Sequence, residues 1–285
     1  MILGNLTRGV IAVPERLGPA LAPPLAPLTP RARARSSGAC RFRSRPCLPN
    51  AHPAVTLSHM LPWTELGRAT VPGDETPMIL ARRGDEFIIR VGATPLMSSR
   101  MHDSEEQLAE GACQRLMNRD AARIVVGGLG MGFTLAAALR ALPPTADVLV
   151  AELVPAIVEW NRGELGELAG RPLDDKRVTV AVGDVAPMIH GANKLVDAIL
   201  LDVDNGPSAI TRKTNERLYG VEGLKATLRS LRPHGILAVW SVAPDDAFTR
   251  RLNTAGFATE ITTVRAHAGK GTRHFLWFAR RSGKE

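Results

Sequence analysis

Cysteine is scarce in this chain, with three residues among 285. Two of them, Cys40 and Cys47, lie in the first 59 residues, so the rest of the chain contains only Cys113. One cysteine supports neither a disulfide framework nor a zinc cluster, and we expect Cys113 to lie in an apolar core in a reducing, cytoplasmic compartment. No metal is predicted, because metal-ligand spacing is also missing among the scattered histidines, His190, His234, His267 and His274.

Long hydrophobic runs are absent as well. No apolar run approaches the roughly 20 residues that a membrane-spanning helix needs, so we predict no membrane partner. A chain of 285 residues is long enough to bury one large core, or a core with a small additional unit.

The first 59 residues lack lysine and contain one acid, Glu15, against eight arginines. They also hold nine of the 21 prolines and have no sustained apolar periodicity, so we expect residues 1–59 to be disordered. A targeting leader, a flexible interaction tail and an over-extended gene start are the open interpretations. We favour the last, with Met60 as the natural first residue.

The net charge of +8 belongs almost entirely to that segment. Residues 1–59 carry +7, whereas the 28 basic and 27 acidic residues of the remainder give +1. A basic chain attracts polyanions, but this remainder is close to neutral, so we predict no nucleic-acid binding by the folded part.

Residues 60–102 predict a small antiparallel β unit. Apolar stretches at residues 77–81 and 86–91 flank Arg83-Gly84-Asp85, which is a hairpin turn signal. Such a unit is marginally stable alone, so we expect it to pack on the next domain or on a second subunit, as in a homodimer.

A helix is predicted to follow, with Ser104 as N-cap and Gln107 as its partner in a capping box. Acids in a first helical turn are favoured by the helix dipole and are often simply solvated. This interpretation and a contact with substrate both remain open for Glu106.

Residues 123–152 organise the rest of the chain as strand, glycine turn, helix and strand. The turn contains the candidate cofactor-binding glycines Gly128, Gly130 and Gly132. Glycines allow φ > 0 and a close approach of ligand to backbone, and the helix beyond offers free N–H groups. Glu152 ends the second strand, 20 residues after Gly132, where a carboxylate can accept both hydroxyls of a ribose.

The glycines have an alternative role in tight strand-to-helix packing. The register of strand, glycines, helix and acid favours a nucleoside instead. A dinucleotide site prefers G-x-G-x-x-G, whereas residues 128–132 read G-x-G-x-G, which is typical of class I methyltransferase-like proteins that bind S-adenosylmethionine or its relatives.

Two further strands are predicted to end in carboxylates. Asp184 closes the third strand, where it suits an adenine amino group or the N-cap of the next turn. Asp202 and Asp204 follow the fourth strand at the sheet edge where open α/β folds bind ligands. The segment 204–207, DNGP, is also favourable turn chemistry.

Strands alternate with helices over residues 103–285 and end in a β-hairpin. This order predicts an α/β fold, a Rossmann-like seven-stranded sheet of the methyltransferase type with one reversed strand and helices on both faces. The β unit of residues 60–102 precedes it.

Residues 77–281 resemble the spermidine synthase, or polyamine aminopropyltransferase, family. Segment 124–135, IVVGGLGMGFTL, corresponds to that family's strand and GGGDGGTL turn. Segment 197–207 resembles its strand ending in D-x-x-D-P-x-G-P, and Tyr219 with segment 231–236, LRPHGI, resembles its F-Y and L-K-P-G-G-I.

The resemblance implies transfer of an aminopropyl group from decarboxylated S-adenosylmethionine to a small-molecule amine. By it, Glu152 would hold the ribose, Asp184 the adenine, and Asp202 would take the proton of the attacking amine. A carboxylate also attracts an ammonium, so Asp204 fits as second acceptor for a diamine. Tyr219 is the corresponding substrate candidate.

The chain departs from that family where Met131 replaces the aspartate expected to face the donor's ammonium. Tyr219 is also the only tyrosine, so the segment 103–107 supplies no substrate-lining tyrosine. Three hypotheses follow: aminopropyl transfer, methyl transfer from S-adenosylmethionine, and a non-catalytic nucleoside-binding homologue. Met131 favours the second, because the carboxylate of S-adenosylmethionine would not tolerate an acid there.

Overall fold

The computed structural model describes residues 61–72, 75–191, 195–203, 206–207, 217–267 and 270–283. All of them belong to the second of the chain's two units, Val55–Glu285. The predicted leader, residues 1–59, and the candidate Asp204 lie outside the described residues. Within the described ranges, no helix has the length and apolarity to cross a membrane.

The predicted β unit is a four-stranded antiparallel sheet, larger than the hairpin expected from the sequence. Its strands, in spatial order, are β1 (Thr64–Thr70), β2 (Pro77–Arg83), β3 (Glu86–Val91) and β4 (Thr94–Ser98). The predicted hairpin corresponds to β2 and β3, with Gly84 at φ 62° in the turn. Strand β1 escaped the prediction because it lies at an edge and exposes most of its residues, so its sequence shows no buried face.

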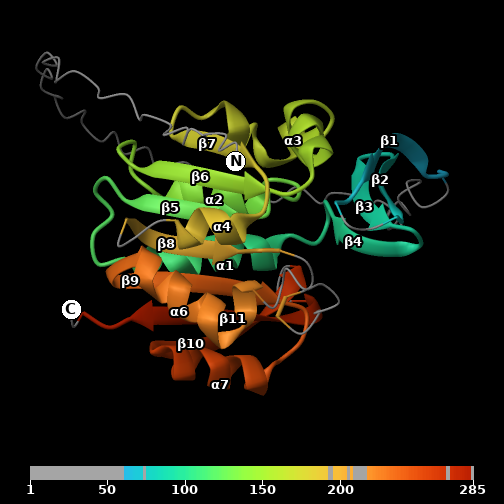
Figure 1. Ribbon diagram of the computed structural model, residues 1–285. Helices are drawn as coiled ribbons and strands as arrows, with labels where there is room; N and C mark the ends of the chain where they lie inside the picture. Colours follow the sequence, from blue (N-terminus) through green and yellow to red (C-terminus); the bar gives the residue numbers. More distant parts are fainter. Residues whose placement is uncertain are drawn as a thin grey trace, which may run out of the picture. The chain divides into compact units, whose positions relative to one another are not determined.

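A seven-stranded sheet follows in the order β10-β11-β9-β8-β5-β6-β7, and it confirms the predicted fold class (Figure 1). The reversed strand is β11, which pairs antiparallel with both β9 and β10. The strands are β5 (Arg123–Gly127), β6 (Asp147–Glu152), β7 (Val178–Val182), β8 (Val196–Leu201), β9 (Leu231–Ser241), β10 (Phe257–His267) and β11 (Lys270–Arg281).

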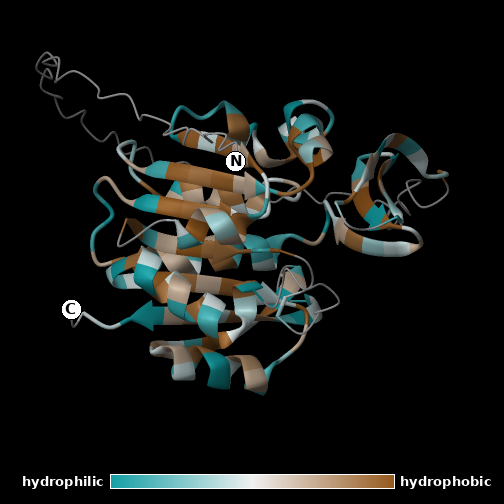
Figure 2. Ribbon diagram, in the orientation of Figure 1, coloured by the Kyte–Doolittle hydropathy of each residue, from teal (hydrophilic) through white to brown (hydrophobic). Residues whose placement is uncertain are grey.

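Helices cover both faces of this sheet. They are α1 (Asp103–Gln114), α2 (Phe133–Ala141), α3 (Pro155–Arg162), α4 (Val185–His190), α6 (Val221–Ser230) and α7 (Asp246–Ala255), with short 3-10 turns at Gly166–Ala169 and Pro172–Asp174. Along β5, Ile124 and Val126 pack on the side of α1, α2 and α3, whereas Val125 packs on the side of α4, α6 and α7. The central strands are therefore apolar on both faces, and their residues are coloured mostly as hydrophobic in Figure 2.

The start of α1 differs from the prediction. Its N-cap residue is His102, without a side-chain cap bond, so the predicted capping box of Ser104 and Gln107 is wrong. Ser104 is instead fully buried inside the first turn, and Gln107 Nε2 donates to the Asp103 carbonyl at 3.1 Å. Cys113, on the inner face of the same helix, is 1% exposed and lies in the core as expected.

Candidate active site

The carboxyl ends of β5, β6, β7 and β8 meet at one edge of the sheet. Backbone bonds fix their relative heights: Gly128 N–H donates to the Ala151 carbonyl at 2.9 Å, and Asp202 N–H donates to the Gly127 carbonyl at 3.0 Å. On the other side of β6, Gly183 N–H donates to the Glu152 carbonyl at 2.8 Å. Parallel pairing therefore delivers the three predicted carboxylates Glu152, Asp184 and Asp202 to the same edge.

Glycine is required at two points of the turn after β5. Gly128 has φ 86°, and a Cβ there would collide with the backbone carbonyl of Asp202. Gly132, also at φ 86°, is the N-cap residue of α2 and leaves space for Asn161. Asn161 supports the turn, since its Nδ2 donates to the Gly130 carbonyl at 2.8 Å. The turn therefore presents bare backbone at the sheet edge.

A pocket opens beside this turn, and two of the three candidate glycines, Gly128 and Gly130, line it, whereas Gly132 lies outside the lining. Leu96, Met97 and Ser98 of β4 also line the pocket. Strand β4 of the predicted β unit thus contributes three residues directly to the candidate site.

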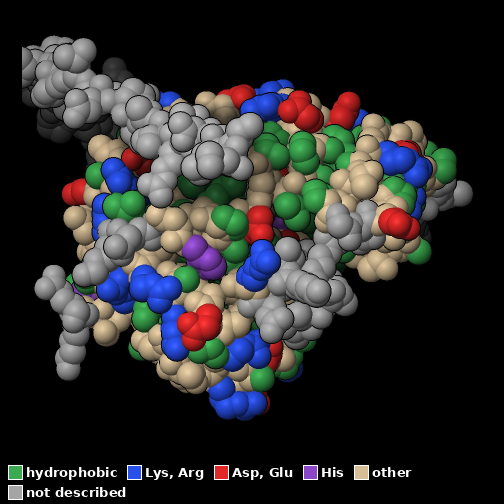
Figure 3. Space-filling model, viewed as in Figure 1, with side chains coloured by type: hydrophobic (Ala, Val, Ile, Leu, Met, Phe, Trp, Pro, Cys, Tyr) green, Lys and Arg blue, Asp and Glu red, His purple; other side chains and the backbone are tan. Residues whose placement is uncertain are grey.

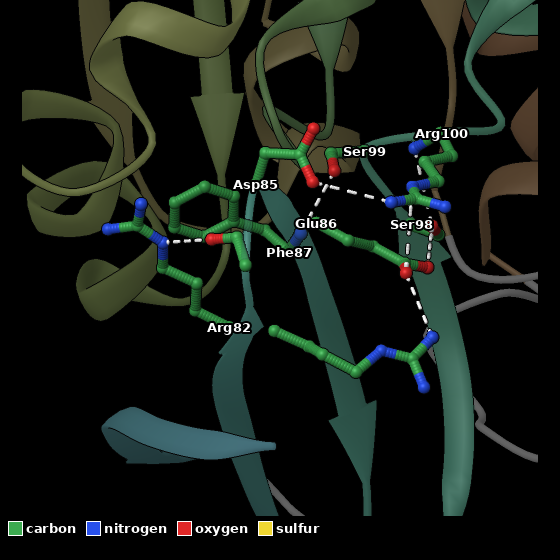
Figure 4. A network of polar contacts seen from close by, with 9 residues as sticks. Arg82, Asp85, Glu86, Phe87, Ser98, Ser99 and Arg100 are labelled. Atoms are coloured by element: carbon green, nitrogen blue, oxygen red, sulfur yellow. Dashed lines mark hydrogen bonds and ion pairs between the residues drawn. The ribbon is translucent and has the colours of Figure 1, made fainter. Parts of the chain in front are cut away.

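An ionic network holds β4 in place (Figure 4). Glu86 on β3 accepts from Arg83 at 2.9 Å and lies 3.6 Å from Arg100 Nε. Ser98 Oγ donates to the same carboxylate at 3.5 Å, and Arg100 also bonds Asp85 at 3.3 Å. Because Ser98 lines the pocket and also bonds Glu86, this network fixes the position of the β4 residues at the pocket.

Glu152 lies at the pocket with 5% of its surface exposed. Its Oε2 accepts from Leu129 N–H and its Oε1 from Val154 N–H, each at 2.8 Å. Burial raises the pKa of Glu152, and the backbone N–H groups oppose that shift. The backbone N–H groups of Gly130 and Leu153 also favour the charged carboxylate, which therefore anchors the glycine turn; its role as acceptor for a hydroxyl donor stays a prediction.

Asp184 lines the same pocket and caps α4. Its Oδ1 accepts from Ala186 N–H at 2.9 Å, so the N-cap interpretation of the sequence is confirmed. The adenine contact stays a prediction that this geometry leaves open.

Asp202 lines the pocket directly after β8. Its Oδ2 accepts from Thr134 Oγ1 at 2.8 Å, which ties it to the first turn of α2. Withdrawal of the carboxylate from bulk solvent raises the pKa of Asp202 to about 6, and the hydrogen bond from Thr134 opposes that shift.

The sequence analysis missed Glu105 as a site residue. Its carboxylate lines the pocket from α1, and burial together with the charge of Asp202 raises the pKa of Glu105 to about 8. We call Glu105 and Asp202 the carboxylate pair. No local signal distinguished Glu105 from Glu106, because both are acids in the first turn of one helix.

Two predicted substrate residues fall outside the pocket lining. Glu106 bonds Arg140 on α2 at 2.5 Å and lies 2.8 Å from His102 Nδ1, so it links α1 to α2. Tyr219 is fully buried against α7, where its ring lies edge-on to the ring of Phe248 with the two ring centroids 5.5 Å apart. The substrate role that the resemblance implies for Tyr219 stays a prediction.

Every titratable side chain among the described pocket residues is a carboxylate: Glu105, Glu152, Asp184 and Asp202. The surface differs, since Lys and Arg side chains are mixed with Asp and Glu on the face drawn in Figure 3. The acidic character therefore belongs to the pocket. Met131, which replaces the acid of the resembling family, is buried and lines it too. The described residues contain no cluster of His, Cys, Asp and Glu suited to a metal ion.

Polyamine aminopropyltransferases of Mycobacterium tuberculosis and Mycobacterium bovis are each 26% identical to this chain over 199 residues. The chain is a distant homologue of these enzymes. The match covers 67% of the chain but 36% of each relative, so the chain spans about a third of the length of the curated relatives it matches. No family model matches.

Solved spermidine synthase structures have the same fold. The enzyme from Thermotoga maritima aligns with a TM-score of 0.62 at 15% identity, covering 77% of this chain and 73% of that one. A spermidine synthase in complex with the transition-state analogue AdoDATO aligns with a TM-score of 0.64 at 16% identity, covering 77% and 74%. At these identities the alignments show a shared fold, in which a seven-stranded sheet of the methyltransferase type follows a four-stranded antiparallel sheet.

Proposed function

We propose that the protein transfers an aminopropyl group from decarboxylated S-adenosylmethionine to a small amine. The observation that carries the proposal is the pocket lining, whose described titratable groups are four carboxylates and no basic side chain. Both reactants are cations, a sulfonium with an ammonium and a protonated amine, so an acidic pocket complements them. The distant aminopropyltransferase homologues support the same reaction.

The nucleoside half of the donor fits the sheet edge. Glu152 would accept from the ribose hydroxyls while it keeps its two backbone N–H bonds, and Asp184 would accept from the adenine amino group. The glycine turn lets the ligand approach the backbone that Glu152 holds. These assignments rest on the position of each carboxylate in the pocket.

Asp202 would act as the base. The amine arrives as an ammonium, loses one proton to Asp202, and attacks the carbon next to the sulfonium. The new C–N bond forms as the C–S bond breaks, which leaves a secondary ammonium, a neutral thioether and one released proton. A carboxylate with a pKa near 6 is ionised at neutral pH and is held at one oxygen by Thr134, which suits it for proton transfer.

Glu105 would face the acceptor's second ammonium, whose charge opposes the raised pKa of Glu105 and favours the ionised carboxylate in the complex. It faces the same space as Asp202 but comes from α1, so an acceptor with two amino groups has a carboxylate for each. The sequence assigned this second role to Asp204, which lies outside the described residues. Glu105 therefore joins Asp204 as a candidate for it.

Met131 favours a second function, methyl transfer from intact S-adenosylmethionine. Its buried apolar side chain lines the pocket where an acid would repel the carboxylate of that cofactor. The described lining, however, offers that carboxylate no cationic side chain, so we rank methyl transfer second.

Calorimetry with the full chain separates these functions. We expect decarboxylated S-adenosylmethionine to bind at least tenfold more tightly than intact S-adenosylmethionine, and turnover with a diamine to release the thioether nucleoside. Tighter binding of the intact cofactor would overturn the proposal in favour of methyl transfer. Tight binding of either without turnover of any amine would indicate a non-catalytic homologue.

A further inference from the structure

Ser104 is the centre of a hydrogen-bond chain that the proposed reaction does not use. Its hydroxyl lies 2.6 Å from Glu105 Oε2, 3.0 Å from Trp240 Nε1 and 2.8 Å from His274 Nδ1. Ser104 has no exposed surface, while His274 on β11 is half-buried with its ring edge-on to Trp240 at 4.7 Å. This hydrogen-bond chain therefore joins the pocket carboxylate of Glu105 to the partly exposed imidazole of His274.

Since Ser104 contacts only the Oε2 atom of Glu105, the donors and acceptors around Ser104 allow two complete arrangements, one with and one without a proton on Oε2. A hydroxyl donates one hydrogen bond and accepts two, and Trp240 Nε1–H always takes one acceptor position. If Oε2 carries no proton, as in the ionised group, Ser104 donates to Glu105 and accepts from His274 Nδ1–H. If Oε2 carries the proton, it donates to Ser104, which donates to His274 Nδ1, and the ring carries its proton on Nε2.

Mixed arrangements are penalised. A Glu105 protonated on Oε2 beside a His274 that carries a proton on Nδ1 would aim three donors at one buried oxygen. An ionised Glu105 beside a bare Nδ1 would leave one of two acceptors without the single Ser104 proton. A proton on Glu105 Oε2 and the tautomer of His274 are therefore coupled by Ser104.

We propose that Glu105, Ser104 and His274 form a proton relay between the pocket and the solvent. Glu105 gives its proton to Ser104 Oγ, the Ser104 proton moves to His274 Nδ1, and the Nε2 proton leaves to water. No bond other than O–H and N–H changes, and the ring resets its tautomer by exchange with water. On the proposed function, on which this role rests, the relay removes the proton that each turnover releases into the carboxylate pair.

Burial and charge set the order of titration. Burial, and after it the charges of Asp202 and Asp103, raise the pKa of Glu105, whereas burial lowers the pKa of His274. At neutral pH, Glu105 then carries the proton and the His274 ring is neutral with a bare Nδ1.

Nitrogen NMR of the histidine ring in the ligand-free full chain tests the relay without any assay of activity. As Glu105 loses its proton, we expect the neutral His274 ring to switch from the Nε2–H to the Nδ1–H tautomer. The midpoint should coincide with the titration of the Glu105 carboxyl carbon. A ring that keeps one tautomer across that titration would overturn the relay.

Variants distinguish the hydrogen-bond chain from a simple field effect. In Ser104→Ala and in Glu105→Gln, the tautomer should no longer switch with pH. Asp103→Asn is the matched control, because it removes a neighbouring acid on the same helix but leaves all three residues of the hydrogen-bond chain in place. It should keep the switch and move its midpoint to lower pH. A switch that persists in Ser104→Ala would also refute the relay, and the wild-type titration decides the matter if that variant does not fold.

Turnover supplies a separate readout. With an active amine acceptor, His274→Phe should lower kcat at least fivefold while the affinity for the sulfonium nucleoside changes less than twofold. If no amine is turned over but the tautomer switch is observed, the proposed function fails and the relay stands. If turnover is found without the switch, the relay fails and the proposed function stands.

Discussion

Thr134 donates its side-chain hydroxyl to Asp202 Oδ2 at 2.8 Å, which joins the first turn of α2 to the end of β8. This bond stabilises the ionised carboxylate and so opposes the rise in the pKa of Asp202. In Thr134→Val the pKa of Asp202 should rise further, and the acid limb of kcat/KM should move to higher pH by about 0.5–1 unit. Thr134→Ser keeps the hydroxyl and should retain the wild-type profile. An unshifted limb in the valine variant would mean that Asp202 does not set it.

Asp202→Asn tests the base itself. The amide keeps the shape and can still accept from Thr134, but it takes no proton from an ammonium. We expect kcat to fall by roughly 10²–10⁴ while the calorimetric affinity for the donor nucleoside changes little. Asp147→Asn, at the opposite end of the sheet, is the matched control and should be neutral. Near-normal turnover of Asp202→Asn would remove Asp202 from the mechanism.

Glu105 should make the ligand-free protein less stable as pH rises. Its pKa is about 8 in the folded protein against an ordinary value of 4.5, so the folded state binds the proton more tightly. The stabilising contribution is complete below pH 4.5 and is lost as pH rises through 8. Relative to wild type, Glu105→Gln should gain on the order of 2–4 kcal/mol between pH 5 and pH 8.5 in denaturant unfolding.

Glu106→Gln is the natural control for that measurement. It removes the neighbouring acid, which is paired with Arg140 outside the pocket lining, so its stability curve should keep the wild-type slope. An equal change of slope in both variants would show that Glu105 has no special environment.

Glu152 should matter for both stability and binding. The sequence alone suggests that Glu152→Ala weakens nucleoside binding with little loss of fold. The two backbone bonds to Leu129 and Val154 change this expectation, because alanine leaves two buried N–H groups unpaired. We expect a loss of about 2–4 kcal/mol in unfolding free energy, and a similar loss in donor affinity. Glu152→Gln keeps one acceptor oxygen, so it should lose less unfolding free energy and less donor affinity than the alanine variant. An unchanged donor affinity in Glu152→Ala would contradict the ribose assignment.

Removal of residues 1–59 should leave folding and donor affinity unchanged, because their proline and arginine content cannot form a core. Limited proteolysis should converge on a stable fragment that starts near Met60, and calorimetry on a 60–285 fragment should give the wild-type affinity. Failure of that fragment to fold would show that the leader contributes to the core.

The sequence by itself determined the fold class and the edge of the sheet that forms the site. Apolar runs, the glycine turn and the alternation of strands with helices are local signals. In a parallel sheet the carboxyl ends of the strands all lie at the same edge, so residues that directly follow these strands must meet there. Glu152, Asp184 and Asp202 could therefore be placed together from their positions after three strands. Gly128 was predictable for the same reason, since the turn after β5 requires φ > 0.

Only the tertiary structure decided which helical residues reach the pocket. Glu105 and Glu106 differ by about 100° around α1, and the packing of that helix on the sheet turns one inward and the other toward Arg140. Ser104 has a cap-like sequence context, but its partners Trp240 and His274 come from β9 and β11, far along the chain. Such contacts have no signature in the local sequence, because they depend on how β9 and β11 pack against the first turn of α1.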